Sequence, residues 1–203
     1  LALNRRLAAI VTAPLNKEAL HLGGHHYSGH TEILAKLTNS PNYAMMLIDG
    51  GLRVIHVSTH VSLREACDLV TKARVEDVIR LAHDFGKLLS IRNPVIGVSG
   101  LNPHAGEGGL FGDEEIREIA PAIESVKRDG ILAEGPFPPD TAFAKARDGH
   151  YDFVVAMYHD QGHIPTKMIG YSSKGPELQT HEFSGVNVTV GLPIVRTSVD
   201  HGT

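Results

Sequence analysis

The segment Tyr151-Asp-Phe-Val-Val-Ala-Met-Tyr-His159 is an apolar run that ends in a histidine. Two earlier segments repeat this arrangement, namely Arg53-Val-Ile-His-Val-Ser-Thr-His60 and Pro94-Val-Ile-Gly-Val-Ser-Gly-Leu-Asn-Pro-His104. Short apolar runs rich in β-branched residues are typical of buried strands, and helical patterns separate these three runs. The sequence therefore predicts three parallel strands that share one sheet.

The histidine that follows each strand points to a site at one edge of that sheet. In open parallel sheets, ligands bind beyond the carboxyl ends of the strands. Three neutral imidazoles that converge there would suit a divalent metal ion with an open coordination position. A single histidine at a strand end is more often a hydrogen-bonded loop residue, so the hypothesis depends on the threefold repetition. We predict that His60, His104 and His159 bind a metal ion in a metal-assisted enzyme.

Further apolar runs alternate with helical patterns, which predicts an α/β fold with a mostly parallel sheet flanked by helices. One antiparallel pair is expected around Asp49-Gly-Gly51, because Asp-Gly between apolar runs indicates a hairpin. Ser62 and Asp113 are expected to cap helices. Strands are predicted over 7–11, 43–48, 53–57, 95–98, 131–134, 153–157, 186–190 and 194–199. Helices are predicted over 18–22, 31–37, 75–89, 113–128 and 140–147, with loops over 12–17 and 135–139.

The composition argues against some classes of function. The 203 residues are 42% hydrophobic and 21% charged, as in a soluble globular protein. A net charge of −4 without a Lys/Arg run argues against a nucleic-acid partner, and no apolar stretch approaches a membrane span. The lone Cys67 fits a reducing compartment, so we expect a cytoplasmic protein. Because the chain starts at Leu1 and stops just after a strand, we also expect a piece of a longer protein.

Two other features have competing interpretations. The glycine-rich segment 106–112 fails as a dinucleotide fingerprint, because Phe111 occupies the position of a required glycine, and we interpret it as a tight turn before a helix. Lys167 and Arg196 could hold a phosphate or carboxylate group, or could be solvated surface charges.

The residues next to the candidate ligands suggest supporting roles. His30 and Thr31 stand at a predicted helix start and could join the two cations in holding an anion. Asp160 and Gln161 directly follow His159, so either could fix the tautomer of an imidazole.

Five segments along the chain carry distinctive motifs: Ser28-Gly-His-Thr-Glu32, Gly100-Leu-Asn-Pro-His-Ala-Gly-Glu-Gly-Gly109, Gly135-Pro-Phe-Pro-Pro-Asp-Thr141, Ala156-Met-Tyr-His-Asp-Gln-Gly162 and Gly185 to Thr203. Together they resemble the 4-hydroxythreonine-4-phosphate dehydrogenases of pyridoxal 5′-phosphate biosynthesis and their close paralogues. The resemblance runs along the whole chain. It implies two α/β/α domains and a homodimer whose metal site takes ligands from both subunits. Residues 1–22 and 192–203 would then be pieces of the first domain, and 23–191 the second domain, which forms the dimer interface.

The resemblance also implies roles for individual residues. His60, His104 and His159 would be the metal ligands, in agreement with the strand-end argument. Substrate would be bound by His30, Thr31, Lys167, Asn187 and Arg196, and we assign catalytic roles to Lys167, His159 and Asp160. The implied cofactors are NAD or NADP and a divalent metal such as Zn²⁺, Mg²⁺ or Co²⁺. No residue is assigned to the nicotinamide cofactor.

The predicted reaction is oxidation of a phosphorylated hydroxy acid, 4-phosphohydroxy-L-threonine or a close analogue, followed by decarboxylation of the keto acid. Segment 171–184 replaces the family's usual short link, and His163 stands where biosynthetic members tend to be apolar. Both favour a paralogue acting on a threonate or erythronate phosphate, and we expect 171–184 to be a loop beside the active-site cleft. A metal-dependent hydrolase and a non-catalytic dimerisation module are the alternatives.

Overall fold

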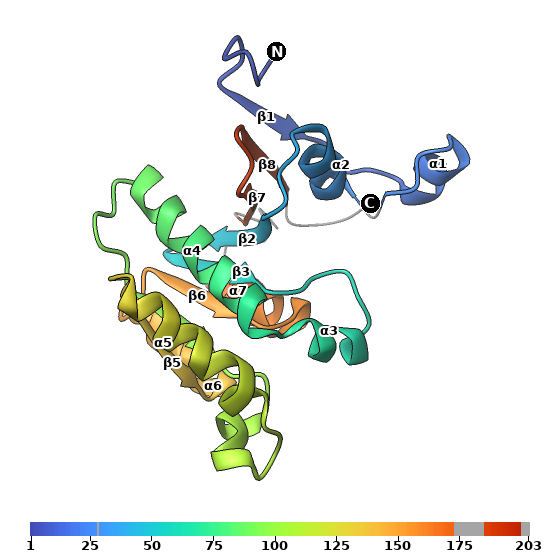
Figure 1. The fold of residues 1–203 in the computed structure, drawn as a ribbon. Helices are drawn as coiled ribbons and strands as arrows, with labels where there is room; N and C mark the ends of the chain where they lie inside the picture. The colour runs from blue at the N-terminus through green and yellow to red at the C-terminus, as the bar shows by residue number, and fades with distance from the viewer. Residues whose placement is uncertain (28, 173–184, 200–203) are drawn as a thin grey trace.

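The computed structural model describes residues 1–27, 29–172 and 185–199, in which one sheet of eight strands forms the centre (Figure 1). The strand order is β1-β8-β7-β2-β3-β6-β4-β5. The strands are Ala9–Thr12 (β1), Ala44–Asp49 (β2), Leu52–His56 (β3), Ile96–Ser99 (β4), Ala133–Phe137 (β5), Phe153–Ala156 (β6), Val186–Val190 (β7) and Val195–Val199 (β8). The α/β class predicted from the sequence is confirmed.

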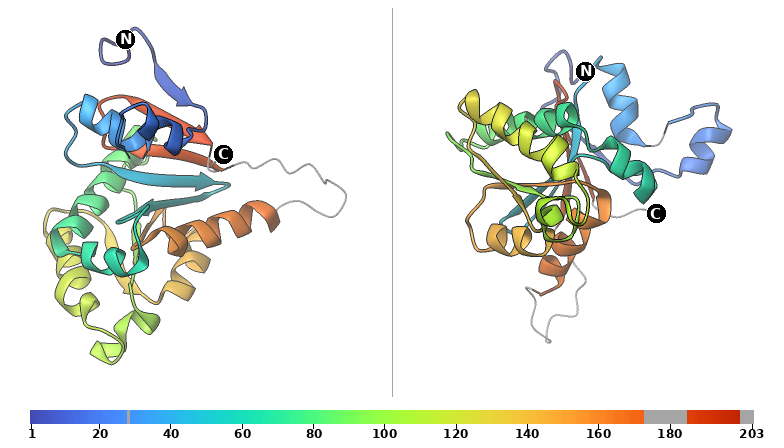
Figure 2. Two further views of the ribbon diagram at one scale, coloured as in Figure 1. Left: turned by 90° about the vertical axis from the view of Figure 1, so that its right-hand side faces the viewer. Right: turned by 60° about the horizontal axis from the view of Figure 1, so that its bottom comes forward.

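Helices cover both faces of the sheet, with α4 and α5 on one side and α6 and α7 on the other (Figure 2). The helices are Lys17–Leu22 (α1), His30–Leu37 (α2), Leu63–Leu69 (α3), Lys72–Leu88 (α4), Ala120–Arg128 (α5), Pro139–Arg147 (α6) and His159–Ser172 (α7). A short 3₁₀ segment, Pro103–Gly109 (η1), and a π-helical turn, Glu115–Ile119 (η2), precede α5.

The observed strand directions match the predicted ones for the strands that precede the three histidines and differ from them for β7. The three strands that precede the histidines are neighbours, and β6 pairs in parallel with both β3 and β4, as predicted. The β2–β3 hairpin is antiparallel, also as predicted. The expectation of a single antiparallel pair is wrong, because β7 runs antiparallel to both β2 and β8. The chain reverses after β7 at Gly191, whose φ of 95° suits glycine, so β7 and β8 form a hairpin within a mixed sheet.

Two apolar layers hold the helices to the sheet. Consecutive residues of a strand point to opposite faces, so Ile55 joins the layer under α4 and α5 while Val54 joins the layer under α6. The apolar stripe of α4 that the sequence predicts is buried, at Val75, Val78, Ile79 and Ala82. The carboxyl ends of β3, β6 and β4 are thereby fixed side by side.

Some element boundaries differ from the prediction. Ser62 caps α3 as expected, with its hydroxyl accepting a hydrogen bond from the Glu65 N–H at 3.2 Å. Asp113 does not cap a helix; its carboxylate pairs with Arg117 at 2.9 Å, and a π-helical turn precedes α5. Residues 135–137, predicted as loop, belong to β5.

Helix α7 is the largest element that the sequence did not predict. Gly162 and Pro165 lie inside it, and both residue types weaken isolated helices. A Cβ atom at position 162 would lie 2.3 Å from Nε2 of His56, so glycine is needed where α7 crosses β3. Tertiary packing therefore overrides local propensity here. The predicted loop over 171–184 begins inside α7, and its part from 173 to 184 lies outside the described residues.

The predicted division into residues 1–22, 23–191 and 192–203 stays a prediction. Strands β1 and β8, from the two outer pieces, pair in parallel at one end of the sheet.

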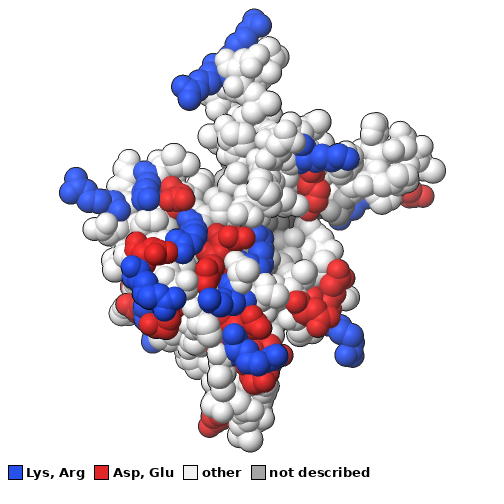
Figure 3. Space-filling view, viewed as in Figure 1, with Lys and Arg blue, Asp and Glu red and all other residues white. Residues whose placement is uncertain are grey.

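Over α4 and α5, cationic and anionic side chains intermix on the surface (Figure 3), including the pairs Lys72–Glu76 and Lys127–Glu124. In the described part of the chain, no helix is long and apolar enough to cross a membrane.

Candidate active site

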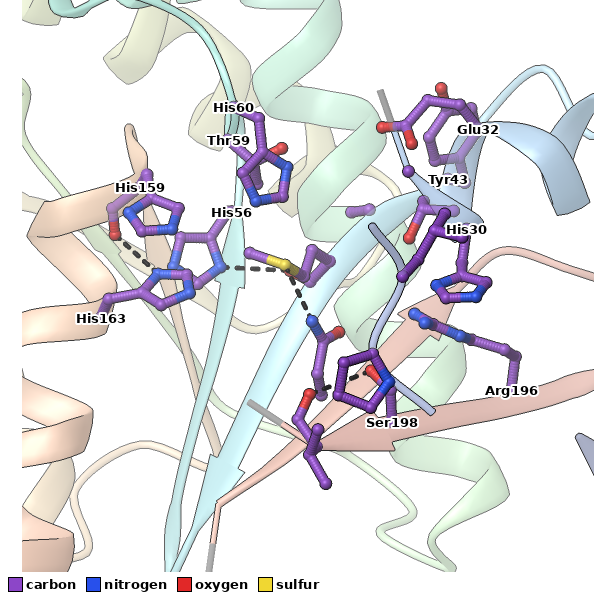
Figure 4. Close-up of a pocket in the computed structure, with 18 of the residues that line it drawn as sticks. His30, Glu32, Tyr43, His56, Thr59, His60, His159, His163, Arg196 and Ser198 are labelled. Carbon is purple, nitrogen blue, oxygen red and sulfur yellow. Dashed lines mark hydrogen bonds between the residues drawn. The ribbon is translucent and has the colours of Figure 1, made fainter. Parts of the chain in front are cut away.

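A cavity of about 450 Å³ lies over the sheet between the start of α2 and the start of α7 (Figure 4). Seven of the residues predicted to form the site line it: His30, Thr31, His60, His159, Lys167, Asn187 and Arg196. Two others, His104 and Asp160, are not among its lining residues. The cavity thus gathers predicted site residues that are up to 166 positions apart in the chain, between His30 and Arg196.

One half of the cavity is formed by imidazoles. The ring centroids of His60 and His159 are 5.5 Å apart, and the ring of His159 stacks on that of His163 at 3.6 Å. Asp160 Oδ1 is 2.7 Å from Nδ1 of His159. When Nδ1 carries the proton of that hydrogen bond, Nε2 keeps its lone pair. Asp160 is therefore suited to orient His159 rather than to contact a ligand in the cavity.

Burial favours the neutral form of His60, His56 and His163. Desolvation is the main cause that lowers the pKa of His60, with the charges of Lys17 and His159 adding to it. Burial and the neighbouring histidines lower the pKa of His56 to about 3 and that of His163 to about 4. Neutral imidazole is the form that binds metal ions, so the electrostatics of this half of the cavity suit a metal ligand set.

The donor chemistry fits a divalent metal, but the described residues of one chain bring too few donors together. Nowhere in residues 1–27, 29–172 and 185–199 do three His, Cys, Asp or Glu side chains come together as a metal site. His60 and His159 adjoin, whereas the ring of His104 lies beside Phe111, 6.1 Å between centroids. The three-histidine site therefore stays a prediction, and two of its three members meet within one chain.

His104 begins an unusual left-handed turn. The φ angles of His104, Ala105, Gly106, Glu107 and Gly108 are all positive, between 43° and 76°. Such a conformation costs roughly 1–2 kcal/mol for each residue with a Cβ atom, so the surroundings must enforce it. The glycine-rich segment is thus a tight turn before a helix, as predicted, with the candidate ligand at its start.

The other half of the cavity is cationic. Arg196 is only 3% exposed, and its Nη1 and Nη2 donate to Thr189 Oγ1 at 3.1 Å and Thr12 Oγ1 at 2.7 Å. Thr31 Oγ1 is 3.1 Å from Thr189 Oγ1, which links the start of α2 to the same group. Burial lowers the pKa of Arg196, and Glu32 partly opposes this.

No carboxylate of the described residues pairs with Arg196, and its Nε has no hydrogen-bond partner among them. A buried cation without a paired anion is costly unless a ligand supplies the anion. This half of the cavity is therefore suited to a phosphate or carboxylate group.

Comparison with known proteins identifies the family. All of residues 1–203 match the model described as "Pyridoxal phosphate biosynthetic protein PdxA". The chain belongs to the PdxA family. The resemblance derived from its motifs is confirmed.

Two curated PdxA-family relatives match the chain over all 203 residues. It is 56% identical to D-threonate 4-phosphate dehydrogenase of Salmonella typhimurium and 51% identical to 4-hydroxythreonine-4-phosphate dehydrogenase of Beijerinckia indica. The chain covers 59% and 57% of these proteins. A crystal structure of 4-hydroxythreonine-4-phosphate dehydrogenase from Klebsiella pneumoniae matches the fold with a TM-score of 0.87 at 52% identity, covering 100% of this chain and 58% of that one. The chain thus spans about three fifths of its relatives' length.

Sequence reasoning missed several residues that line the cavity in this PdxA-family chain, among them Lys17, Glu32, Tyr43, His56 and Arg74. Lys17 is the first residue of α1, directly after the loop that follows β1, so its place shortly after a strand was an available signal. Arg74 carried no such signal. It lies on α4 and donates to the carbonyl oxygens of Tyr43 and Val57 at 2.9 and 3.0 Å, contacts that only the tertiary structure reveals.

Proposed function

We propose that this PdxA-family protein is an NAD- or NADP-dependent, divalent-metal-dependent dehydrogenase of D-threonate 4-phosphate or a closely related phosphorylated hydroxy acid. The observation that carries the proposal is the cavity itself, which is lined both by a buried guanidinium that has no paired carboxylate among the described residues and by a cluster of imidazoles. The names of the relatives support the substrate class, and several of them are named for D-threonate 4-phosphate.

The cationic half would bind the anionic groups of the substrate. Arg196, held by two threonine hydroxyls, would donate charge-assisted hydrogen bonds to the phosphate, with His30 and Thr31 beside it. Lys167, on α7, would neutralise the second anionic group and Asn187 would complete the contacts. These contacts fix the pose of the substrate, so that its secondary hydroxyl points to the imidazoles.

The imidazole half would hold the metal. His60 and His159 would be ligands, and Asp160 would keep His159 in the tautomer that presents Nε2. His60 and His159 would thereby hold a divalent ion whose Lewis acidity would favour the ionised form of the substrate hydroxyl, and a bound nicotinamide would supply the hydride acceptor. The product, a β-keto acid, then loses CO₂. Lys167, which lines the same cavity, would keep the departing carboxylate positioned until the C–C bond breaks.

The third ligand would come from a second copy of the chain. Exposed apolar side chains surround the His104 turn, with Leu110 71% exposed and Phe111 and Ile116 also exposed. On α7, Ile164 and Met168 are exposed near the cavity. An isologous dimer would cover such apolar surfaces and could bring His104 of one copy to His60 and His159 of the other.

The test measures the reduced nicotinamide that purified protein produces from NAD or NADP with each of two acids as substrate. D-threonate 4-phosphate carries a hydroxyl at C2 where 4-phosphohydroxy-L-threonine carries an ammonium. We expect kcat/KM for the threonate to be higher by at least about tenfold. A chelator should abolish turnover, and added Zn²⁺, Mg²⁺ or Co²⁺ should restore it. Absence of reduced nicotinamide with both acids, or metal-dependent release of phosphate instead, would overturn the proposal in favour of an unrelated activity or a hydrolase.

A further inference from the structure

Buried polar side chains continue the hydrogen bonding of the sheet beyond the ends of β3, β6 and β4. Ser58 Oγ donates to the carbonyl oxygen of Met157 at 2.9 Å. The Met157 N–H donates to Oε1 of Gln161 at 2.7 Å, and Nε2 of Gln161 donates to the carbonyl oxygen of Gly100 at 2.9 Å. One side-chain amide therefore bridges the end of β6 and the end of β4.

This bridge lies among the three candidate ligands. Gln161 is two residues after His159, Gly100 is four residues before His104, and Ser58 is two residues before His60. Ser58 and Gln161 are 5% and 8% exposed, so water competes little for their hydrogen bonds. The geometry of each histidine loop is thereby tied to that of its neighbour.

The Gly100 end of the bridge is itself anchored to the turn of His104. The buried carboxylate of Glu115 accepts hydrogen bonds from the N–H groups of Leu101 and Asn102, at 2.8 and 2.7 Å. A Cβ atom at Gly106 would lie 2.7 Å from Oε2 of Glu115, so the turn packs directly against this carboxylate. A displacement of Gly100 would therefore also shift the left-handed turn that His104 begins, through their shared contacts with Glu115.

We propose that Gln161 is a positioning residue, whose amide fixes the loop of His104 relative to the helix that starts at His159. The role needs one side chain that accepts from an N–H and donates to a carbonyl at the same time. An ionised glutamate at this position could only accept, and methionine, of similar length, could do neither effectively. The benefit for metal binding rests on the proposed function, whereas the coupling of the two loops does not.

The test compares Gln161→Met and Gln161→Glu with a matched control, Asp152→Leu. Asp152 links the same two strands at their opposite ends, where its carboxylate accepts from the Val95 N–H at 2.8 Å, far from any candidate ligand in the sheet. Two readouts are used on purified protein: amide hydrogen exchange of residues 101–109, and titration of the metal-free protein with Co²⁺. The first needs no metal and no substrate.

Both Gln161 variants should speed exchange in residues 101–109 by about tenfold or more and weaken Co²⁺ binding by about tenfold. Asp152→Leu should speed exchange near Val95. It should leave the exchange of residues 101–109 and the affinity for Co²⁺ within about twofold of the wild-type values. If residues 101–109 of Gln161→Met exchange at the same rate as in the wild type, the inference is overturned. If wild-type protein takes up no metal ion, the proposed function fails, and the exchange data still decide whether Gln161 couples the loops.

Discussion

At the residue scale, His56 should make stability depend on pH. It is fully buried on β3, and burial lowers its pKa from 6.5 to about 3. Between these values the unfolded chain binds a proton that the folded chain does not, so stability is fully present above pH 6.5 and is lost as pH falls toward 3. About 2 kcal/mol of this contribution to the free energy of unfolding should be lost between about pH 7 and about pH 5.

The variant His56→Asn isolates this contribution. The asparagine amide can still donate to the Met45 carbonyl, as Nδ1 of His56 does at 3.2 Å, but it does not titrate. Urea unfolding of metal-free protein at the two pH values should show a smaller loss for the variant, by about 2 kcal/mol. Equal losses in the two proteins would contradict the assignment.

Arg196 should matter more for ligand binding than for folding. Replacing it by methionine removes a buried charge that has no paired carboxylate among the described residues, so the ligand-free protein should keep its melting temperature. Stabilisation of the wild type by inorganic phosphate should be lost, and kcat/KM should fall roughly 10- to 100-fold.

The matched control for this prediction is Arg53→Met. Arg53 is a partly buried arginine of β3, and it donates to the Asp152 carbonyl at the end of the sheet remote from the cavity. Its replacement should leave phosphate stabilisation intact. A phosphate response that survives in Arg196→Met would show that the anion binds elsewhere.

At the element scale, the crossing of α7 over β3 should be sensitive to any side chain at position 162. In Gly162→Ala the new methyl would meet Nε2 of His56 and a methyl of Val54 at 2.3 and 2.8 Å, inside van der Waals contact. We expect a loss of about 1–3 kcal/mol in unfolding free energy. Gly51→Ala is the control, because a Cβ atom there has open space around it and should change stability little. Equal effects of the two substitutions would mean that α7 does not approach β3 so closely.

The same helix shows where sequence patterns stop being informative. Helix α4 was predicted because its apolar stripe recurs every three to four residues and its packing agrees with that period. Helix α7 contains Gly162 and Pro165, so neither propensity nor period indicated a helix. Its glycine serves a contact with His56, which is more than a hundred positions away. Such a residue is chosen by the tertiary structure, and a single sequence does not show why.

At the scale of the whole molecule, the site divides into a predictable and an unpredictable half. Strand-end position was enough to place His60 and His159 near each other, because β3 and β6 are parallel neighbours. The cationic half depends on β7 and β8, whose direction was predicted wrongly. The residues alone left Lys167 and Arg196 open between anion binding and surface charge, and the family resemblance decided between the two. Pairing of Thr189 with Met45 extends the site across the face of the sheet, a register that no local pattern encodes.

The incomplete metal site leads to the prediction for the assembled protein. If His60 and His159 of one copy join His104 of another, then His60→Asn and His104→Asn should each be inactive alone. In a dimer that contains one chain of each kind, one site lacks both histidines and the other keeps all three ligands. Equal co-expression makes about half of the dimers mixed, so activity and bound metal should recover to about a quarter of the wild-type values.

This recovery depends on where the ligands come from. If all three histidines of a site belonged to the same chain, every site in a mixed dimer would lack one of them, and mixing would restore nothing. Mixing His60→Asn with His159→Asn is the matched control. These two side chains adjoin within one chain, 5.5 Å between ring centroids, so every site in that mixed dimer is damaged. Recovery in the first mixture and not in the second would establish a site built by two copies, with the His104 turn reaching across the interface.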